Sequence, residues 1–162
     1  MKAELRALKK NASEQKRANQ LMVSRIKRKK PTDLDNTINK LHKQVFKETD
    51  CTQCANCCKK GSPSFSFTDI KRLAGHLGIT NKAFRKKYLM KADDGDLMFS
   101  KTPCVFLGKD NRCTVYEARP ANCRQYPHTQ RSDYFRNLEL GIDNTFLCPA
   151  VLRIYERMRE VY

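Results

Sequence analysis

The feature that most constrains this chain is a run of cysteines at residues 51–58, which read CTQCANCC. Thiolates bind zinc and iron–sulfur clusters strongly, and two residues between cysteines let one tight turn present both sulfurs to one metal. Cys57 and Cys58 are adjacent, so in extended backbone their side chains point to opposite sides. We therefore expect the run to supply three sulfurs to one site and to leave Cys58 for a second site or a supporting role.

Further cysteines follow the run, and the chain has eight in all. The four outside the run are Cys104, Cys113, Cys123 and Cys148. Eight cysteines can also form four disulfides, which is the main alternative. The first residues are charged at every second or third position and lack the apolar stretch of a secretory signal. We therefore expect a cytoplasmic chain, in a reducing compartment where clustered cysteines more often bind metal.

Composition favours a fold that metal helps to stabilise. The chain has 162 residues, of which 40% are hydrophobic, so we expect a modest core supplemented by metal–ligand bonds. No run of about 18 apolar residues occurs, so no membrane span is expected. The net charge of +16 suggests affinity for polyanions. Residues 1–30 hold eleven basic and two acidic residues, which is more than half of this excess.

The first third of the chain has the pattern of two helices. Residues 2–30 lack Gly and Pro and repeat apolar residues every three or four positions, which predicts a basic amphipathic helix that ends before Pro31. A second helix is predicted over residues 33–48, with Thr32 as its N-cap. The apolar stripe of the first helix either packs on the rest of the protein or leaves a basic cluster to contact nucleic acid or another anionic surface. That cluster is Arg25, Lys27, Arg28, Lys29 and Lys30.

Later segments predict shorter helices and one hairpin. Thr68 and Thr80 are each expected to cap a helix, and Cys148 is expected to begin the closing helix, whose dipole would lower the pKa of its thiol. Residues 97–116 are β-prone around a turn and predict a hairpin that brings Cys104 and Cys113 face to face.

The fold class expected from these patterns is mainly α with a small β-hairpin. Residues 1–48 would form a basic helical extension, and residues 49–162 a small, metal-stabilised cysteine-cluster domain. His128, five residues beyond Cys123, is a candidate additional ligand, with a packing or hydrogen-bonding role as its alternative.

The spacing of the cysteines leaves the metal open. Residues 51–57 match the start of the bacterial ferredoxin run C-x2-C-x2-C, and Cys148-Pro149 is similar to its closing Cys-Pro. A C-x2-C pair is equally half of a zinc site. The cofactor is therefore zinc or an iron–sulfur cluster, 4Fe-4S if it is iron. Four thiolates around either carry a net charge near −2, and the candidates to offset it are Lys59, Lys60 and Arg124.

Several motifs together resemble the YkgJ-type CxxCxxCC cysteine-cluster family. They are CTQCANCC at 51–58, PCVFL at 103–107, CTVYEARP at 113–120 and CRQYP at 123–127. The family comprises zinc- or iron-chelating domains, and flagellin lysine N-methylases carry a related cluster. The resemblance implies ligand roles for Cys51, Cys54, Cys57, Cys58, Cys104, Cys113, Cys123 and, as the terminal cysteine, Cys148. The chain is too short for an added methyltransferase fold, so methylase activity of its own is not expected.

The leading hypothesis is a cytoplasmic metal-binding protein with one or two centres, in a structural, redox or accessory role, the last with a protein partner. Eight cysteines fit two four-sulfur sites, and one cluster with spare thiols fits equally. An alternative is an enzyme, either a cluster-dependent oxidoreductase or a subunit of a modification enzyme. A third hypothesis is a zinc-stabilised nucleic-acid-binding protein.

Overall fold

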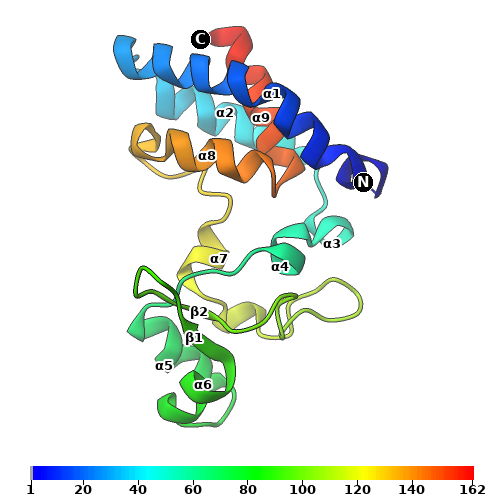
Figure 1. The fold of residues 1–162 in the computed structure, drawn as a ribbon, viewed down its shortest axis with the longest axis vertical. Helices are drawn as coiled ribbons and strands as arrows, with labels where there is room; N and C mark the ends of the chain where they lie inside the picture. The colour runs from blue at the N-terminus through cyan, green and yellow to red at the C-terminus, as the bar shows by residue number, and fades with distance from the viewer. Residues whose placement is uncertain (1) are drawn as a thin grey trace. The chain divides into compact units, whose positions relative to one another are not determined.

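The computed structural model describes residues 2–162, which divide into two units (Figure 1). The helical unit joins the chain up to Cys54 with Pro127–Tyr162, and the central unit is Ala55–Tyr126. The predicted fold class, mainly α with a small β-hairpin, is confirmed. The predicted boundary between residues 48 and 49 stays a prediction.

The helical unit is built around its last helix. Its elements are α1 (Lys2–Lys29), α2 (Leu34–Lys47), α3 (Cys51–Cys54), the 3-10 helix η2 (Tyr134–Asn137), α8 (Leu138–Thr145) and α9 (Pro149–Val161). Helix α9 contacts α1, α2 and α8. It buries apolar residues at three- and four-residue steps, including Val151, Tyr155 and Met158, so one helix provides the apolar surface on which three others pack.

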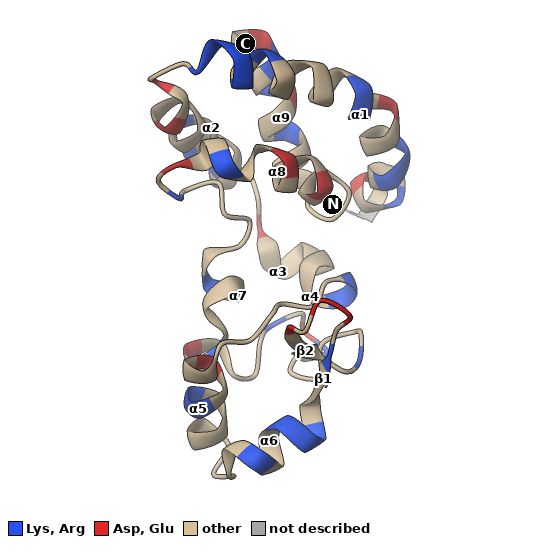
Figure 2. Ribbon diagram, turned by 60° about the vertical axis from the view of Figure 1, so that its left-hand side comes forward, with Lys and Arg blue, Asp and Glu red and all other residues tan. Residues whose placement is uncertain are grey.

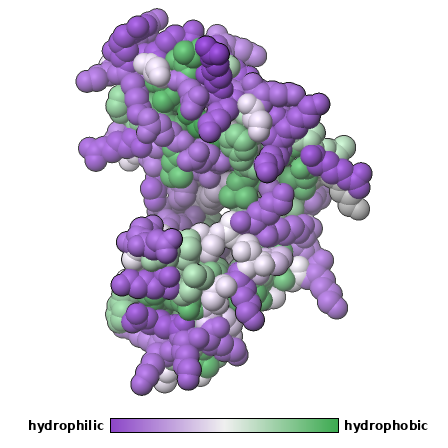
Figure 3. All heavy atoms as spheres, viewed as in Figure 1, coloured by the Kyte–Doolittle hydropathy of each residue, from purple (hydrophilic) through white to green (hydrophobic). Residues whose placement is uncertain are grey.

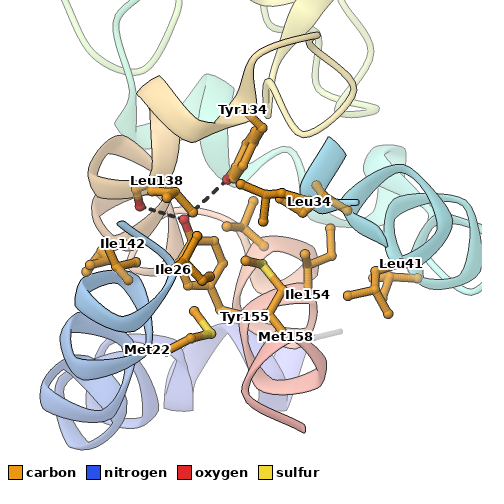
Figure 4. Packing of buried hydrophobic residues seen from close by; sticks show 14 of the residues in the cluster. Met22, Ile26, Leu34, Leu41, Tyr134, Leu138, Ile142, Ile154, Tyr155 and Met158 are labelled. Atoms are coloured by element: carbon orange, nitrogen blue, oxygen red, sulfur yellow. Dashed lines mark hydrogen bonds between the residues drawn. The ribbon is translucent and has the colours of Figure 1, made fainter. Parts of the chain in front are cut away.

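Two buried tyrosines close this core (Figure 4). The Tyr155 hydroxyl donates to the Leu138 carbonyl at 2.6 Å, and it lies 3.3 Å from the hydroxyl of Tyr134. A buried hydroxyl needs such partners, because leaving it unpaired costs about 1–3 kcal/mol. Gly141 of α8 lies against both hydroxyl groups, where a Cβ atom would come within 1.9 Å of the Tyr155 oxygen.

The first two helices end and begin close to the predicted positions. Helix α1 stops just before Pro31, as predicted, and its apolar stripe lies in the core through Met22 and Ile26. The N-cap of α2 is Asp33, so the prediction of Thr32 was wrong by one residue. The carboxylate of Asp35 accepts the backbone N–H groups of Asp133 and Tyr134 at 2.7 and 2.9 Å, which fixes the start of η2 on α2.

The central unit has short elements and its own apolar core. They are α4 (Asn56–Lys60), α5 (Phe67–His76), α6 (Asn81–Tyr88), β1 (Leu89–Lys91), β2 (Leu97–Phe99), the 3-10 helix η1 (Tyr116–Ala118) and α7 (Ala121–Gln125). Phe65, Phe99 and Phe106 pack edge to face in this core, with ring centroids 4.7 and 5.8 Å apart. The core also includes Ile70, Leu73, Ala74, Phe84, Val115 and Ala118.

The hairpin lies earlier in the chain than predicted. Strands β1 and β2 pair antiparallel, with Leu89 opposite Phe99, around a tight turn. The prediction of a hairpin over residues 97–116 was wrong, because β2 pairs with the segment before it. The later segment keeps a turn with a single bridge between Leu107 and Cys113, and the Thr114 N–H donates to the Phe106 carbonyl at 2.9 Å.

Helix α5 begins at a capping box that the sequence prediction missed. Its N-cap is Ser66 instead of Thr68: the Ser66 hydroxyl accepts the Asp69 N–H, and the Asp69 carboxylate accepts the Ser66 N–H. Asp69 also binds Arg72 at 2.5 Å and the Ala121 N–H at 2.9 Å. One buried carboxylate therefore ties α5 to the start of α7. Helix α6 begins after Thr80, as predicted.

The surface is strongly polar. Hydrophilic residues cover most of the face drawn in Figure 3. Basic side chains interrupt helix α6 repeatedly (Figure 2), where Arg85, Lys86 and Lys87 follow one another. Across residues 2–162, none of the helices has the length and apolar character needed to span a bilayer.

Candidate metal centres

The cysteine run is folded as two short helices with a break between them. Ala55 separates α3 from α4 and has the left-handed backbone angles φ 48° and ψ 21°. This conformation is unfavourable for a residue with a Cβ atom. The break makes Cys51 and Cys54 the ends of one helical turn and puts Cys57 and Cys58 on the next. The expectation of extended backbone at Cys57 and Cys58 was therefore wrong, and their sulfurs are 4.0 Å apart.

Three thiols belong to the helical unit, where Cys51 is exposed, Cys54 is buried and Cys148 is half-buried. Cys148 is the N-cap of α9, as predicted. Burial raises the pKa of its thiol to about 11, and the nearby Cys54 and Cys51 raise it further. The expectation of a lowered pKa was wrong: the N–H groups of the helix N-terminus act in that direction, but burial outweighs them. The electrostatic effect of Cys51 and Cys54 on Cys148 indicates that the three thiols are neighbours.

The other five thiols belong to the central unit. The Cys104 N–H donates to the Cys58 carbonyl at 2.8 Å, which joins α4 to the 104–113 segment. Burial raises the pKa of Cys123, on α7, to about 12, and the thiols of Cys58, Cys104 and Cys113 add to this. Four segments distant in sequence thus bring their thiols within electrostatic range of one another.

One thiol of the central unit is much more acidic than its neighbours. The pKa of Cys58 falls to about 7, because Cys57 hydrogen-bonds to it and the cations Lys59 and Arg119 act on it, although burial opposes this. By contrast, burial raises the pKa values of Cys104 and Cys113. A metal that binds these thiols must displace their protons, so its affinity will rise with pH.

The cations proposed from the sequence contribute unequally. Lys59 acts on Cys58, whereas Lys60 is exposed and Arg124 uses its Nε to donate to the Arg119 carbonyl at 3.1 Å. Arg119, which the sequence analysis did not single out, acts on Cys58, Cys113 and Cys123. Its place between Cys113 and Cys123 in the sequence was the signal that could have found it.

The histidines next to the cysteines are held in the helical unit. His128 has a left-handed backbone with φ 68°, and burial together with Arg131 lowers its pKa. A lowered pKa keeps the ring neutral, which is the form that binds metal. Its ligand role stays a prediction. His42, which the sequence analysis left out of the site, lies 2.7 Å through Nδ1 from the Thr129 hydroxyl and stacks on Phe46.

The basic cluster of α1 is largely exposed. Arg25, Arg28, Lys29 and Lys30 face solvent, and Lys27 binds Glu139 at 2.5 Å. A groove of about 550 Å³ runs between α2 and α9 and is lined by Leu41, Gln44, Lys47, Glu48, Arg157, Glu160 and Val161. No cysteine lines this groove.

The donor set fits a thiolate-bound metal. All eight cysteines are free thiols, so none of them forms the disulfides considered as the alternative. Within residues 2–162, no three histidine, cysteine or carboxylate side chains are already close enough together to hold one ion. Soft thiolate ligands select zinc, copper(I) or iron–sulfur clusters over hard cations.

This helical fold with two groups of free thiols defines a cysteine-rich, metal-chelating class of protein. The chain belongs to the CxxCxxCC family, described as a "putative zinc- or iron-chelating domain", whose model matches residues 50–146. The resemblance drawn from the sequence motifs is thereby confirmed. Neither the curated proteins nor the solved structures contain a match to this chain.

Proposed function

We propose that this protein holds two thiolate metal centres, one in each unit. The centre of the helical unit would use Cys51, Cys54 and Cys148. The centre of the central unit would use Cys58, Cys104, Cys113 and Cys123, with Cys57 as a neighbouring thiol that can replace Cys58. The observation that carries this proposal is the electrostatic grouping of the thiols: Cys148 is influenced by Cys51 and Cys54, and Cys123 by the other three.

The two centres would differ in kind. Four thiolates complete the tetrahedral coordination of zinc or hold one 4Fe-4S cluster, which suits a structural role. Three thiolates leave one coordination position for water, His128 or an external ligand, which suits a redox or accessory role. In both centres the metal supplies cross-linking and, if it is an iron–sulfur cluster, one-electron chemistry. Free thiols in a metal-binding protein favour a reducing, cytoplasmic location.

The test is anaerobic purification followed by metal and sulfide analysis and a visible spectrum. Two zinc ions per chain in a colourless protein support two zinc centres. Brown protein with broad absorption near 400 nm, iron and sulfide supports clusters. Cys123→Ser and Cys148→Ser should each remove the metal of one centre and leave that of the other, whereas Cys57→Ser should retain both. Metal-free protein from anaerobic cells supplied with zinc and iron would contradict the proposal.

A second candidate function is polyanion binding by the end of α1. Arg25, Arg28, Lys29 and Lys30 are exposed, and none of them forms an ion pair within the described part of the chain. Filter binding to RNA or DNA should then weaken steeply with salt. Arg28→Gln/Lys29→Gln should reduce the salt dependence by about two phosphate contacts. Lys40→Gln/Lys43→Gln on α2 is the control with the same change in charge.

A further inference from the structure

Arg119 occupies a fixed position between two of the proposed ligands. It follows η1 and precedes Pro120, the N-cap of the helix that carries Cys123. Its carbonyl accepts hydrogen bonds from Arg72 Nη2 at 2.9 Å and from Arg124 Nε at 3.1 Å. Arg72 is itself held by the buried Asp69 at 2.5 Å. The backbone of Arg119 is therefore anchored to the capping box of α5.

The side chain of Arg119 is held without an acidic partner. Its guanidinium carbon lies 3.6 Å from the centroid of the Tyr116 ring, which is the geometry of a cation–π stack. Its Nε atom is buried and has no hydrogen-bond acceptor. Among the ion pairs of the described residues, none involves Arg119. A partly buried cation without a carboxylate is costly unless other negative charge lies nearby.

We propose that Arg119 is the counter-cation of the four-thiolate centre in the central unit, a positioning residue that becomes fully paired only when metal has deprotonated the thiols. The inference rests on the proposed function of that centre. Four thiolates around Zn²⁺ carry a net charge of −2, and one guanidinium nearby halves it. The influence of Arg119 on Cys58, Cys113 and Cys123 supports this role, since these residues come from three different segments.

An arginine suits this role better than the neighbouring lysines. A guanidinium stays charged, stacks flat on an aromatic ring and presents several N–H donors in a fixed plane. Lys59 influences Cys58 and not Cys113 or Cys123, and Lys60 is exposed. Arg119 is thus the cation shared by several of the proposed ligands, and its stack on Tyr116 fixes where its charge lies.

The test measures zinc binding by the full chain in competition with a chromophoric chelator. Arg119→Gln should weaken binding at the site that Cys104→Ser removes by about 10–100-fold, the usual effect of losing an outer-shell partner. Arg112→Gln is the matched control: it removes one positive charge beside Cys113 from an exposed side chain, and binding should stay near the wild-type value. Arg119→Lys should fall between the two, because it retains the charge and loses the planar stack.

The pH profile separates a counter-cation from a merely structural residue. In Arg119→Gln the midpoint of zinc uptake should move to higher pH, since proton release from the thiols is no longer assisted, while the far-UV circular dichroism stays unchanged. If Arg119→Gln is unfolded, Tyr116→Leu replaces it and should shift affinity and midpoint in the same direction. Equal affinity and midpoint in these variants and Arg112→Gln overturn the inference. If Cys104→Ser retains all bound zinc, the proposed centre itself is wrong.

Discussion

Gly141 offers a sharp test of the core of the helical unit. In Gly141→Ala the new Cβ would lie 1.9 Å from the Tyr155 oxygen and 2.5 Å from the Tyr134 oxygen, far inside van der Waals contact. Both rings are almost completely buried, so they cannot swing into solvent. Relief of the clash must break the hydrogen bond from Tyr155 to Leu138 or force α8 away from α9. Overpacking costs about 1–3 kcal/mol and an unpaired buried hydroxyl about 1–3 kcal/mol.

The gain in helix propensity offsets part of this cost. Alanine is better than glycine inside a helix by about 0.5–1 kcal/mol, so the net loss in the free energy of unfolding should be about 2–4 kcal/mol. Gly75→Ala is the control: Gly75 also lies in a helix, but apart from its own helix backbone nothing lies within 4 Å of the added methyl group, and the substitution should stabilise α5 by that same propensity gain. Urea unfolding followed by circular dichroism measures both variants. Equal stabilisation by the two alanines would refute this packing of α8 on the two tyrosines.

Three further predictions concern the carboxylates and the metal. Asp69→Asn should lower the free energy of unfolding of the central unit by about 2–3 kcal/mol, because it weakens the capping box and leaves Arg72 without its carboxylate, whereas the exposed Glu117→Gln should have little effect in the same urea titration. Burial alone would raise the pKa of Asp69, but hydrogen bonds from Ser66, Ala121 and Arg72 outweigh it and lower the pKa, so this stability is complete above the ordinary carboxyl pKa near about 4 and is lost as pH falls through the lower folded value. The acid-unfolding curve of Asp69→Asn should therefore be flatter below that pH. Asp35→Ala should cost about 1–2 kcal/mol in thermal unfolding, because two N–H groups at the start of η2 lose their acceptor, and an unchanged melting temperature would contradict this. Removal of metal by a chelator should lower the melting temperature of the wild type more than that of Cys123→Ser, which has already lost one centre.

The helices were predictable because their signals are local. Pro31 ends α1, Pro149 begins α9, and the Thr80 hydroxyl caps α6, each through a constraint that acts within one turn. The cap of α5 was misassigned because Ser66 and Thr68 are both good N-cap residues. What favours Ser66 is Asp69, which completes a capping box and also binds Ala121, 52 residues away.

The hairpin and the electrostatics depended on contacts that a linear pattern does not contain. Leu97–Phe99 was correctly identified as a strand, but either neighbouring segment could pair with it, and Leu89–Lys91 does. The pKa of Cys148 was predicted in the wrong direction because the degree of burial at the N-terminus of α9 cannot be read from Cys-Pro alone. Arg119 was missed for the same reason: its stack on Tyr116 is set by the turn of η1.

The boundary of the family match has a practical consequence for anyone who trims the gene. The matched region begins at residue 50 and ends at residue 146, so it contains Tyr134, Leu138 and Ile142 but none of α1, α2 or α9. Those three apolar residues pack against the helices that such a fragment discards. A polypeptide expressed as residues 50–146 would present them to water and would be expected to aggregate, and the flanking helices are thus as necessary to a usable sample as the cysteines themselves.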